Sequence, residues 1–168
     1  MPQFILNNTT DSVAMPSAHG GTVAVRWGGL DNFTQGYIEA LFFTESSPAY
    51  ASDEWHSDEC LEAQTQGTAD GSIPGDVGFS DLSPAALDTI VTDCATFQRD
   101  NAETLARAYD HACSYTAEQA GRDYWYTRNG HGVGFWDRGL GEIGDALSDA
   151  ARYSEVNVSF ETDGKIHL

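Results

Sequence analysis

The feature that most constrains how this chain can fold is the placement of its charges. The 168 residues contain 26 acidic side chains against eight Lys and Arg, which gives a formal net charge of −18. The distribution of these acids is more informative than their total. Between Trp27 and Gln98 there is no Lys or Arg, yet this stretch holds thirteen acids: Asp31, Glu39, Glu45, Asp53, Glu54, Asp58, Glu59, Glu62, Asp70, Asp76, Asp81, Asp88 and Asp93.

A surface of this sign repels phosphate and anionic membranes, and it attracts basic protein surfaces. We therefore expect no direct binding to nucleic acid and no membrane association. No apolar run reaches the roughly 18 residues of a spanning helix, and residues 1–6 lack the basic and apolar regions of a secretory signal. These features predict a cytoplasmic protein; the oligomeric state stays open.

The three cysteines, Cys60, Cys94 and Cys113, cannot all pair within one chain, and none forms a C-x-x-C motif. So few cysteines are unusual for a disulfide scaffold. We expect a reduced compartment, with Cys94 filling the core.

The hydrophobic pattern predicts an α+β fold in a single domain, residues 1–168. Residues 3–8 and 22–27 are typical of short strands, and the alternation at 156–168 around Asp163-Gly164 predicts a hairpin. Helical periods lie between them, at about 33–45, 84–112, 117–126 and 140–153. We expect a small antiparallel sheet from the N- and C-terminal strands, with about four helices packed on it. Residues 46–80 have almost no periodicity and predict a long acidic loop.

Several helix starts are marked by local chemistry. Asp31 or Asn32 can cap the first helix, Ser83-Pro84 is a cap followed by proline, and Thr116 to Gln119 match a capping box. The helix that starts at Ser83-Pro84 could break near residues 100–101, which the sequence does not decide.

The acidic loop concentrates carboxylates around one tryptophan. Clustered charge can steer a basic partner, and an aromatic side chain can anchor it. The alternative is a solvated surface loop. The residues predicted to bind a partner are Asp53, Glu54, Trp55, Asp58, Glu59, Glu62, Asp88 and Asp93.

A second candidate site is the glycine-rich block at residues 124–139. His131 lies between two glycines, where it would be exposed and Asp137 could orient its imidazole for acid–base chemistry. Arginines could hold an anion, and Trp136 could stack on a ring. The alternative is a rigid corner, and no nucleophile or paired carboxylates accompany the block, so we expect no catalytic residues. The candidate set is Arg128, Asn129, His131, Trp136, Asp137 and Arg138.

The same block carries a resemblance. The stretch T-R-N-G-H-G-V-G-F-W-D-R-G at residues 127–139, followed by a G-E-I-G-D-A-L helix, resembles a family of small acidic proteins encoded by bacteriophages and prophages. The resemblance extends weakly upstream to the Ser83-Pro84 helix and covers about half of the chain. It implies a phage or mobile-element origin and does not imply a reaction.

Two further patterns fail in context. Residues 139–144 match a dinucleotide fingerprint literally, but no βαβ unit surrounds them. The pairs His56/Cys60 and His111/Cys113 are too scattered for a zinc site. We expect neither a cofactor nor a metal.

Together these features suggest an anti-CRISPR or anti-restriction inhibitor that binds a basic nucleic-acid-binding surface of a host complex. Duplex DNA carries one charge per roughly 1.7 Å, whereas a helix from Asp88 to Asp110 spans about 33 Å with five acids, reduced by Arg99 and Arg107. Mimicry therefore needs the acids of residues 27–98 on the same surface. The alternatives are a small phage enzyme or ligand-binding protein that uses the glycine-rich block, and a halophilic protein of unrelated role.

Overall fold

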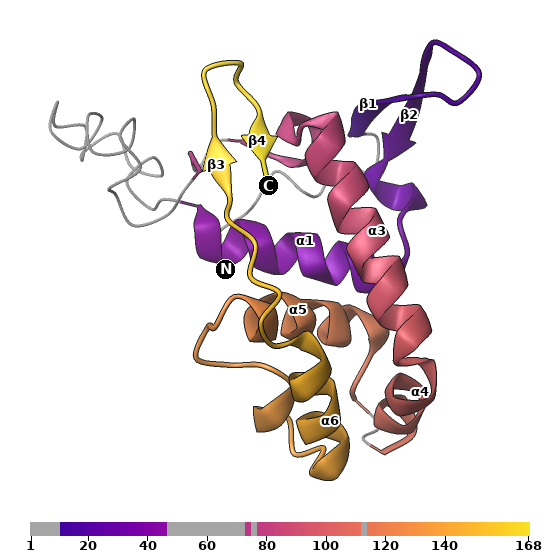
Figure 1. Cartoon of the computed structure of the whole chain (residues 1–168), viewed down its shortest axis with the longest axis vertical. Coiled ribbons are helices and arrows are strands. Elements are labelled where there is room, and N and C mark those ends of the chain that lie inside the picture. The colour runs from indigo at the N-terminus through magenta and orange to yellow at the C-terminus, as the bar shows by residue number, and fades with distance from the viewer. Residues whose placement is uncertain (1–10, 47–72, 75–76, 112–113) are drawn as a thin grey trace, which may run out of the picture. The chain divides into compact units, whose positions relative to one another are not determined.

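The computed structural model describes residues 11–46, 73–74, 77–111 and 114–168 (Figure 1). The chain divides into two compact units. The first contains Met1–Leu30, Phe42–Asp88 and Asn157–Leu168, and the second contains Asp31–Leu41 and Thr89–Val156. No helix in the described part is long and apolar enough to cross a membrane.

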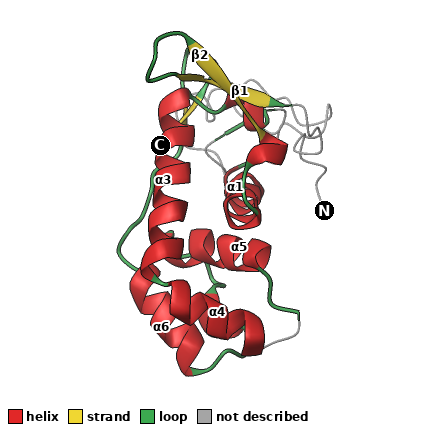
Figure 2. Ribbon diagram, turned by 90° about the vertical axis from the view of Figure 1, so that its right-hand side faces the viewer, coloured by secondary structure: helices red, strands yellow, loops and turns green. Residues whose placement is uncertain are grey.

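The first unit holds the strands. β1 (Ser12–Pro16) and β2 (Thr22–Arg26) pair antiparallel, with Ser12 opposite Arg26, as the yellow hairpin of Figure 2 shows. Gly20 and Gly21 close the turn with φ of 84° and 83°, a backbone conformation that favours glycine. The short helix η2 (Trp27–Gly29) follows β2 directly. A second short helix, η4 (Phe79–Asp81), lies just before the helix that begins at Pro84.

A second hairpin lies at the C-terminus. β3 (Ser159–Phe160) pairs with β4 (Ile166–His167) around a turn in which Gly164 has a φ of 74°. The predicted hairpin is therefore confirmed, with shorter strands. The carbonyl oxygen of Ile166 accepts a hydrogen bond from the backbone N–H of Ser83 at 2.9 Å.

The α+β class and the antiparallel pairing are confirmed. The strands do not join as predicted, because in the described residues they form two separate two-stranded sheets. Each hairpin pairs strands that are adjacent in the chain, because closing a short loop costs less conformational entropy than joining the two ends of the chain. The partner of β2 is β1, and the strand predicted at residues 3–8 lies outside the described residues.

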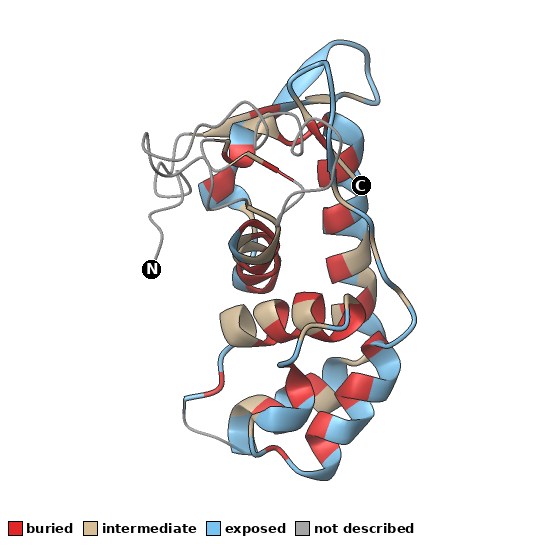
Figure 3. Ribbon diagram, turned by 90° about the vertical axis from the view of Figure 1, so that its left-hand side faces the viewer, coloured by how far each residue is buried: buried red, intermediate tan, exposed pale blue. Residues whose placement is uncertain are grey.

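Helix α1 (Asn32–Glu45) begins where the sequence predicted. The backbone N–H and the hydroxyl of Thr34 both donate to the carboxylate of Asp31, at 3.0 and 2.8 Å, so Asp31 is the cap. Figure 3 shows most of α1 as buried, a wider apolar face than the predicted stripe. The large side chains of α1 that are fully buried are Phe33, Tyr37, Ile38, Leu41 and Phe42.

The long helical period forms two helices, α3 (Pro84–Asp100) and α4 (Ala102–His111). The hydroxyl of Ser83 accepts from the backbone N–H of Ala86 at 3.1 Å, which confirms the predicted start. The break lies at Asn101, whose side-chain amide donates to the carbonyl oxygen of Phe97 at 3.0 Å. A side chain that competes for a helical carbonyl in this way favours the end of a helix. Cys94 on α3 is free and fully buried, as predicted.

In the second unit α5 (Ala117–Arg128) lies against α1 at a contact that only glycine permits. A Cβ on Gly36 would meet the carbonyl oxygen of Glu118, and one on Gly121 would meet that of Phe33. The two backbones therefore approach closely. Helix α1 contributes Tyr37 to the aromatic core, where its ring lies edge-on to the ring of Trp125, with the ring centroids 5.2 Å apart.

The glycine-rich block connects α5 to α6 (Glu142–Ala151). It contains the short helix η5 (Phe135–Asp137), and α6 packs against η5, α4 and α5. A Cβ on Gly144 would lie 2.6 Å from the carbonyl oxygen of Phe135, so this glycine lets α6 approach η5. The fold thus places the block between two helices of the second unit.

Candidate functional site

The predicted partner-binding residues separate into two groups. Six of them, Asp53, Glu54, Trp55, Asp58, Glu59 and Glu62, lie outside the described residues. Asp88 is exposed on α3. Asp93 is half-buried, and its Oδ2 lies 2.9 Å from Nη1 of Arg128. The charge of Asp93 is therefore compensated inside the protein.

Residues 27–98 contain no Lys or Arg between Trp27 and Gln98, but two of their acids form ion pairs with arginines from later in the chain. Nη2 of Arg122 lies 2.6 Å from Oε2 of Glu39 and 2.6 Å from Oε1 of Glu118. Arg122 and Arg128 both come from α5 and pair with acids 83 and 35 positions earlier in the chain. Two of the thirteen acids are thus neutralised by the C-terminal half.

Two more acids of the same stretch have local roles. Asp31 caps α1, and Oδ2 of Asp81 accepts from the backbone N–H of Gly78 at 2.8 Å. The expectation that this stretch presents all its carboxylates to a partner is therefore too broad for the described residues. Carboxylates are more stable beside backbone N–H donors or arginines than unpaired.

Most of the free carboxylates in the described part of the chain lie outside residues 27–98. Those that are exposed, make no ion pair and cap no helix within the described ranges are Asp88, Glu103, Asp110, Glu142, Asp145 and Glu155. On α4, Glu103 and Asp110 are seven positions apart and so share one face, together with Arg107. Glu142 and Asp145 lie three positions apart in the first turn of α6.

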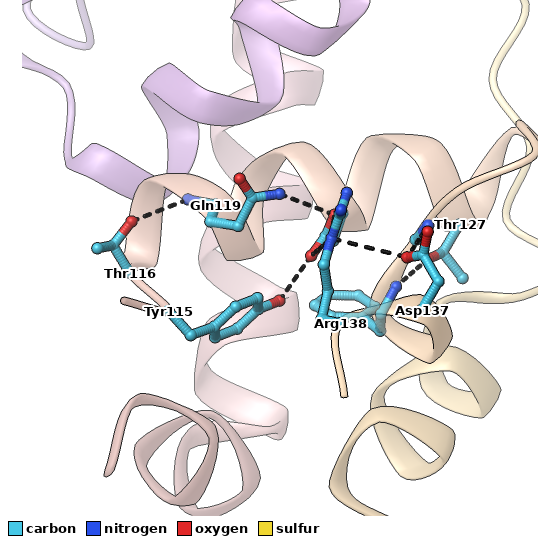
Figure 4. Close-up of polar contacts among 9 residues, drawn as sticks. Tyr115, Thr116, Gln119, Thr127, Asp137 and Arg138 are labelled. Atoms are coloured by element: carbon cyan, nitrogen blue, oxygen red, sulfur yellow. Dashed lines mark hydrogen bonds and ion pairs between the residues drawn. The ribbon is translucent and has the colours of Figure 1, made fainter. Parts of the chain in front are cut away.

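A buried ion pair organises the glycine-rich block. The carboxylate of Asp123 is fully buried and accepts from Nε and Nη2 of Arg138, the shortest bond being 2.7 Å. Figure 4 shows the hydroxyl of Tyr115 and the amide of Gln119 converging on the same carboxylate, at 2.9 and 3.0 Å. The bonds to Asp123 raise the pKa of the Arg138 guanidinium. Burial, followed by the charge of Asp123, raises the pKa of the Tyr115 hydroxyl.

Sequence reasoning missed Asp123. An acid in the middle of a helix normally indicates a solvated face, so its type gave no signal of burial. The capping box gave a partial signal, because Thr116 accepts from the backbone N–H of Gln119 at 3.2 Å as predicted. The side chain of Gln119 then points onward to Asp123, four positions later.

The remaining block residues also hold structural positions. The backbone N–H of Gly134 donates to Oδ1 of Asp137 at 3.1 Å, so this carboxylate caps η5. The ring of Trp136 occupies the space where a Cβ on Gly134 would lie, and the side chain is 40% exposed. His131 is half-buried and not exposed as predicted, with its ring 6.2 Å from that of Trp125. Aromatic packing thus reduces the expected solvent contact.

Arg128 and Asn129 join the block to the chain after α6. Nε of Arg128 donates to the carbonyl oxygen of Ser154 at 2.8 Å, and its Nη1 donates to the hydroxyl of Tyr37 at 2.9 Å. Oδ1 of Asn129 accepts from the backbone N–H of Val156 at 2.9 Å. The arginines predicted to hold an anion are therefore committed to partners inside the protein. This geometry favours the rigid-corner interpretation of the block.

Nothing in the described ranges groups three or more His, Cys, Asp or Glu side chains as a metal site requires. Comparison of the chain with family models, with curated proteins and with solved structures finds no match. The site offers surface carboxylates and a rigid framework held by arginines.

Proposed function

We propose that the protein is a phage-type anti-defence inhibitor, acting on a CRISPR or restriction complex in the host cytoplasm. It binds a basic nucleic-acid-binding surface of that complex by presenting carboxylates where the nucleic acid would present phosphates. It needs no cofactor for this activity. The phage context comes from the resemblance of residues 127–139, and the mechanism comes from the charge.

The observation that supports the mechanism is how little positive charge remains after internal pairing. Five of the seven arginines form ion pairs with carboxylates of the same chain: Arg99, Arg122, Arg128, Arg138 and Arg152. Lys165 donates to the carbonyl oxygen of Ser80. In the described residues, the six exposed carboxylates that make no ion pair and cap no helix therefore remain as negative surface charge. Such a field accelerates encounter with a basic groove and disfavours encounter with DNA.

The proposal is tested by phage plating on cells that carry a defined CRISPR or restriction system. The protein should raise the plating efficiency of a targeted phage. A variant with Glu103→Gln, Asp110→Asn, Glu142→Gln and Asp145→Asn removes four free exposed carboxylates and should lose most of this effect. The matched control combines Asp149→Asn with Arg152→Gln, which removes an exposed ion pair at unchanged net charge. It should keep the effect.

A binding assay addresses the same claim directly. The protein should compete with duplex DNA for the purified target complex, and its affinity should fall as salt rises, because exposed charges are screened within about 10 Å at 0.1 M. A quadruple variant as active as the unmodified protein would refute the carboxylate mechanism. An unfolding midpoint that collapses below molar KCl would instead favour the halophilic alternative.

A further inference from the structure

The second unit contains a cavity of about 390 Å³. One wall is a single face of α3 and the residue that ends it, with Asp93, Phe97 and Asp100 at helical spacing. The opposite wall comes from α5 and from the end of α6. Ligand pockets range from about 300 to 1,000 Å³, so this cavity fits one side chain or a ligand of similar size.

Two carboxylates line the cavity, and each keeps one oxygen available. Asp93 uses Oδ2 for Arg128, and Asp100 uses Oδ1 for Nε of Arg99. Within the described ranges, Oδ1 of Asp93 and Oδ2 of Asp100 accept no hydrogen bond. The pair between Arg99 and Asp100 is exposed on both sides, and exposed pairs contribute little. The cavity can therefore offer carboxylate oxygen to an incoming donor.

The charges of the wall select a cation over an anion. Arg128 is the one base that lines the cavity, and its side chain is only 5% exposed. It already donates from Nε and Nη1 to Ser154, Tyr37 and Asp93. An anion there would face two carboxylates and compete with Asp93 for Arg128. A cation would pair with the free oxygen of Asp93, which would then bridge two guanidinium groups.

An apolar wall accompanies the carboxylates. The rings of Phe97 and Tyr124 stack with centroids 4.1 Å apart and both line the cavity. A planar guanidinium packs on aromatic surface and donates to carboxylate in the same plane, whereas an ammonium is a strongly hydrated point charge. The combination of aromatic wall and carboxylate oxygen suits arginine better than lysine.

We propose that this cavity receives an arginine side chain of the basic partner, paired with Asp93 and attracted by Asp100. The identity of the occupant as a partner residue rests on the proposed function, whereas the selectivity of the cavity for a guanidinium does not. An arginine from a nucleic-acid-binding groove would anchor the complex at a fixed point, and the exposed acids would supply the longer-range attraction.

The selectivity is tested with N-acetyl-L-arginine N-methylamide as the probe and the citrulline analogue as its neutral isostere. Titration followed by 15N NMR should give saturable shifts at Thr96, Asn101 and the Nε of Arg128, with a Kd of about 1 mM, the range of a weak single-group contact. Citrulline should bind at least tenfold more weakly. Equal binding of the two probes, or shifts confined to residues away from the cavity, would overturn the proposal.

Three variants test where the probe binds without changing the pair between Asp93 and Arg128. Ala150→Leu adds a bulky side chain to the cavity lining and should weaken arginine binding at least tenfold, whereas Ala146→Leu, one turn earlier on α6 and also exposed, should leave it unchanged. Asp100→Asn should weaken it about two- to fivefold, as expected for a partly solvated charge. Arginine binding that survives Ala150→Leu would overturn the assignment.

The plating assay separates this proposal from the proposed function. If Ala150→Leu no longer raises the plating efficiency of the targeted phage and Ala146→Leu still does, the result supports the cavity as a partner contact. Inhibition retained by Ala150→Leu would overturn that contact and leave the proposed function standing. Selective arginine binding by a protein that inhibits no defence system would support the cavity and refute the function.

Discussion

Replacing Asp123 by Asn should destabilise the protein far more than neutralising an exposed acid on its surface. The carboxylate is fully buried and accepts bonds from Arg138, Tyr115 and Gln119. An amide of the same shape has only one accepting oxygen, and its NH2 group would face donors. The guanidinium of Arg138 would also lose its counter-charge.

The magnitude follows from the exposure of the partners. Removing one member of a buried ion pair costs about 3–5 kcal/mol. Because the side chain of Arg138 is 28% exposed and can regain water, the lower end applies, about 3 kcal/mol. For a chain of this length each kcal/mol lowers Tm by about 2–4 °C, so Tm should fall by about 6–12 °C.

The assay is urea unfolding, followed by far-UV circular dichroism and by tryptophan fluorescence, to which the buried Trp125 contributes. Asp149→Asn is the control, because Asp149 pairs with Arg152 at the surface and should change stability by less than about 1 kcal/mol. A free energy of unfolding for Asp123→Asn within about 0.5 kcal/mol of the original, at an unchanged m value, would refute the reasoning.

Two further predictions concern packing and pH. Gly121→Ala should destabilise the protein by about 1–3 kcal/mol or more, because the new methyl group meets the backbone of Phe33. Thermal unfolding should show a much smaller change for the control Gly132→Ala, because the space around Gly132 is open. Equal effects of the two variants would contradict the close approach of α1 and α5. Burial raises the pKa of Tyr109 and of Tyr124 from 10.0 to about 12. The raised pKa in the folded state means that folding favours the neutral hydroxyl. The stability that these two tyrosines contribute is therefore complete below pH 10 and is lost as pH rises through about 12. Absorbance at 295 nm should therefore show tyrosines that ionise late, Tyr124→Phe should reduce the loss of stability over this range, and ionisation of all tyrosines near pH 10 without unfolding would contradict the burial.

Several features could be predicted from the sequence because the interactions that produce them are local. Asp31, Ser83 and Thr116 each cap a helix through a backbone N–H three positions later. Asp163-Gly164 forms its turn in the same way, with the backbone N–H of Lys165 donating to Asp163. The α+β class follows from these starts and from the hydrophobic periods between them.

The candidate site depended on contacts that no local pattern contains. In the sequence, Arg128 and Arg138 are candidates for binding an anion. Only the fold shows that they form ion pairs with Asp93 and Asp123. His131 illustrates the same limit, since flanking glycines predicted exposure and aromatic packing reduced it.

The sequence by itself determined where helices and turns begin, and how much negative charge the chain must place at its surface. Tertiary structure decided which acids remain free, as the pair between Glu39 and Arg122 across 83 positions shows. The physical reason is range: a capping bond is made within one turn of the chain, whereas the partner of a charged side chain depends on which distant segments the core brings together.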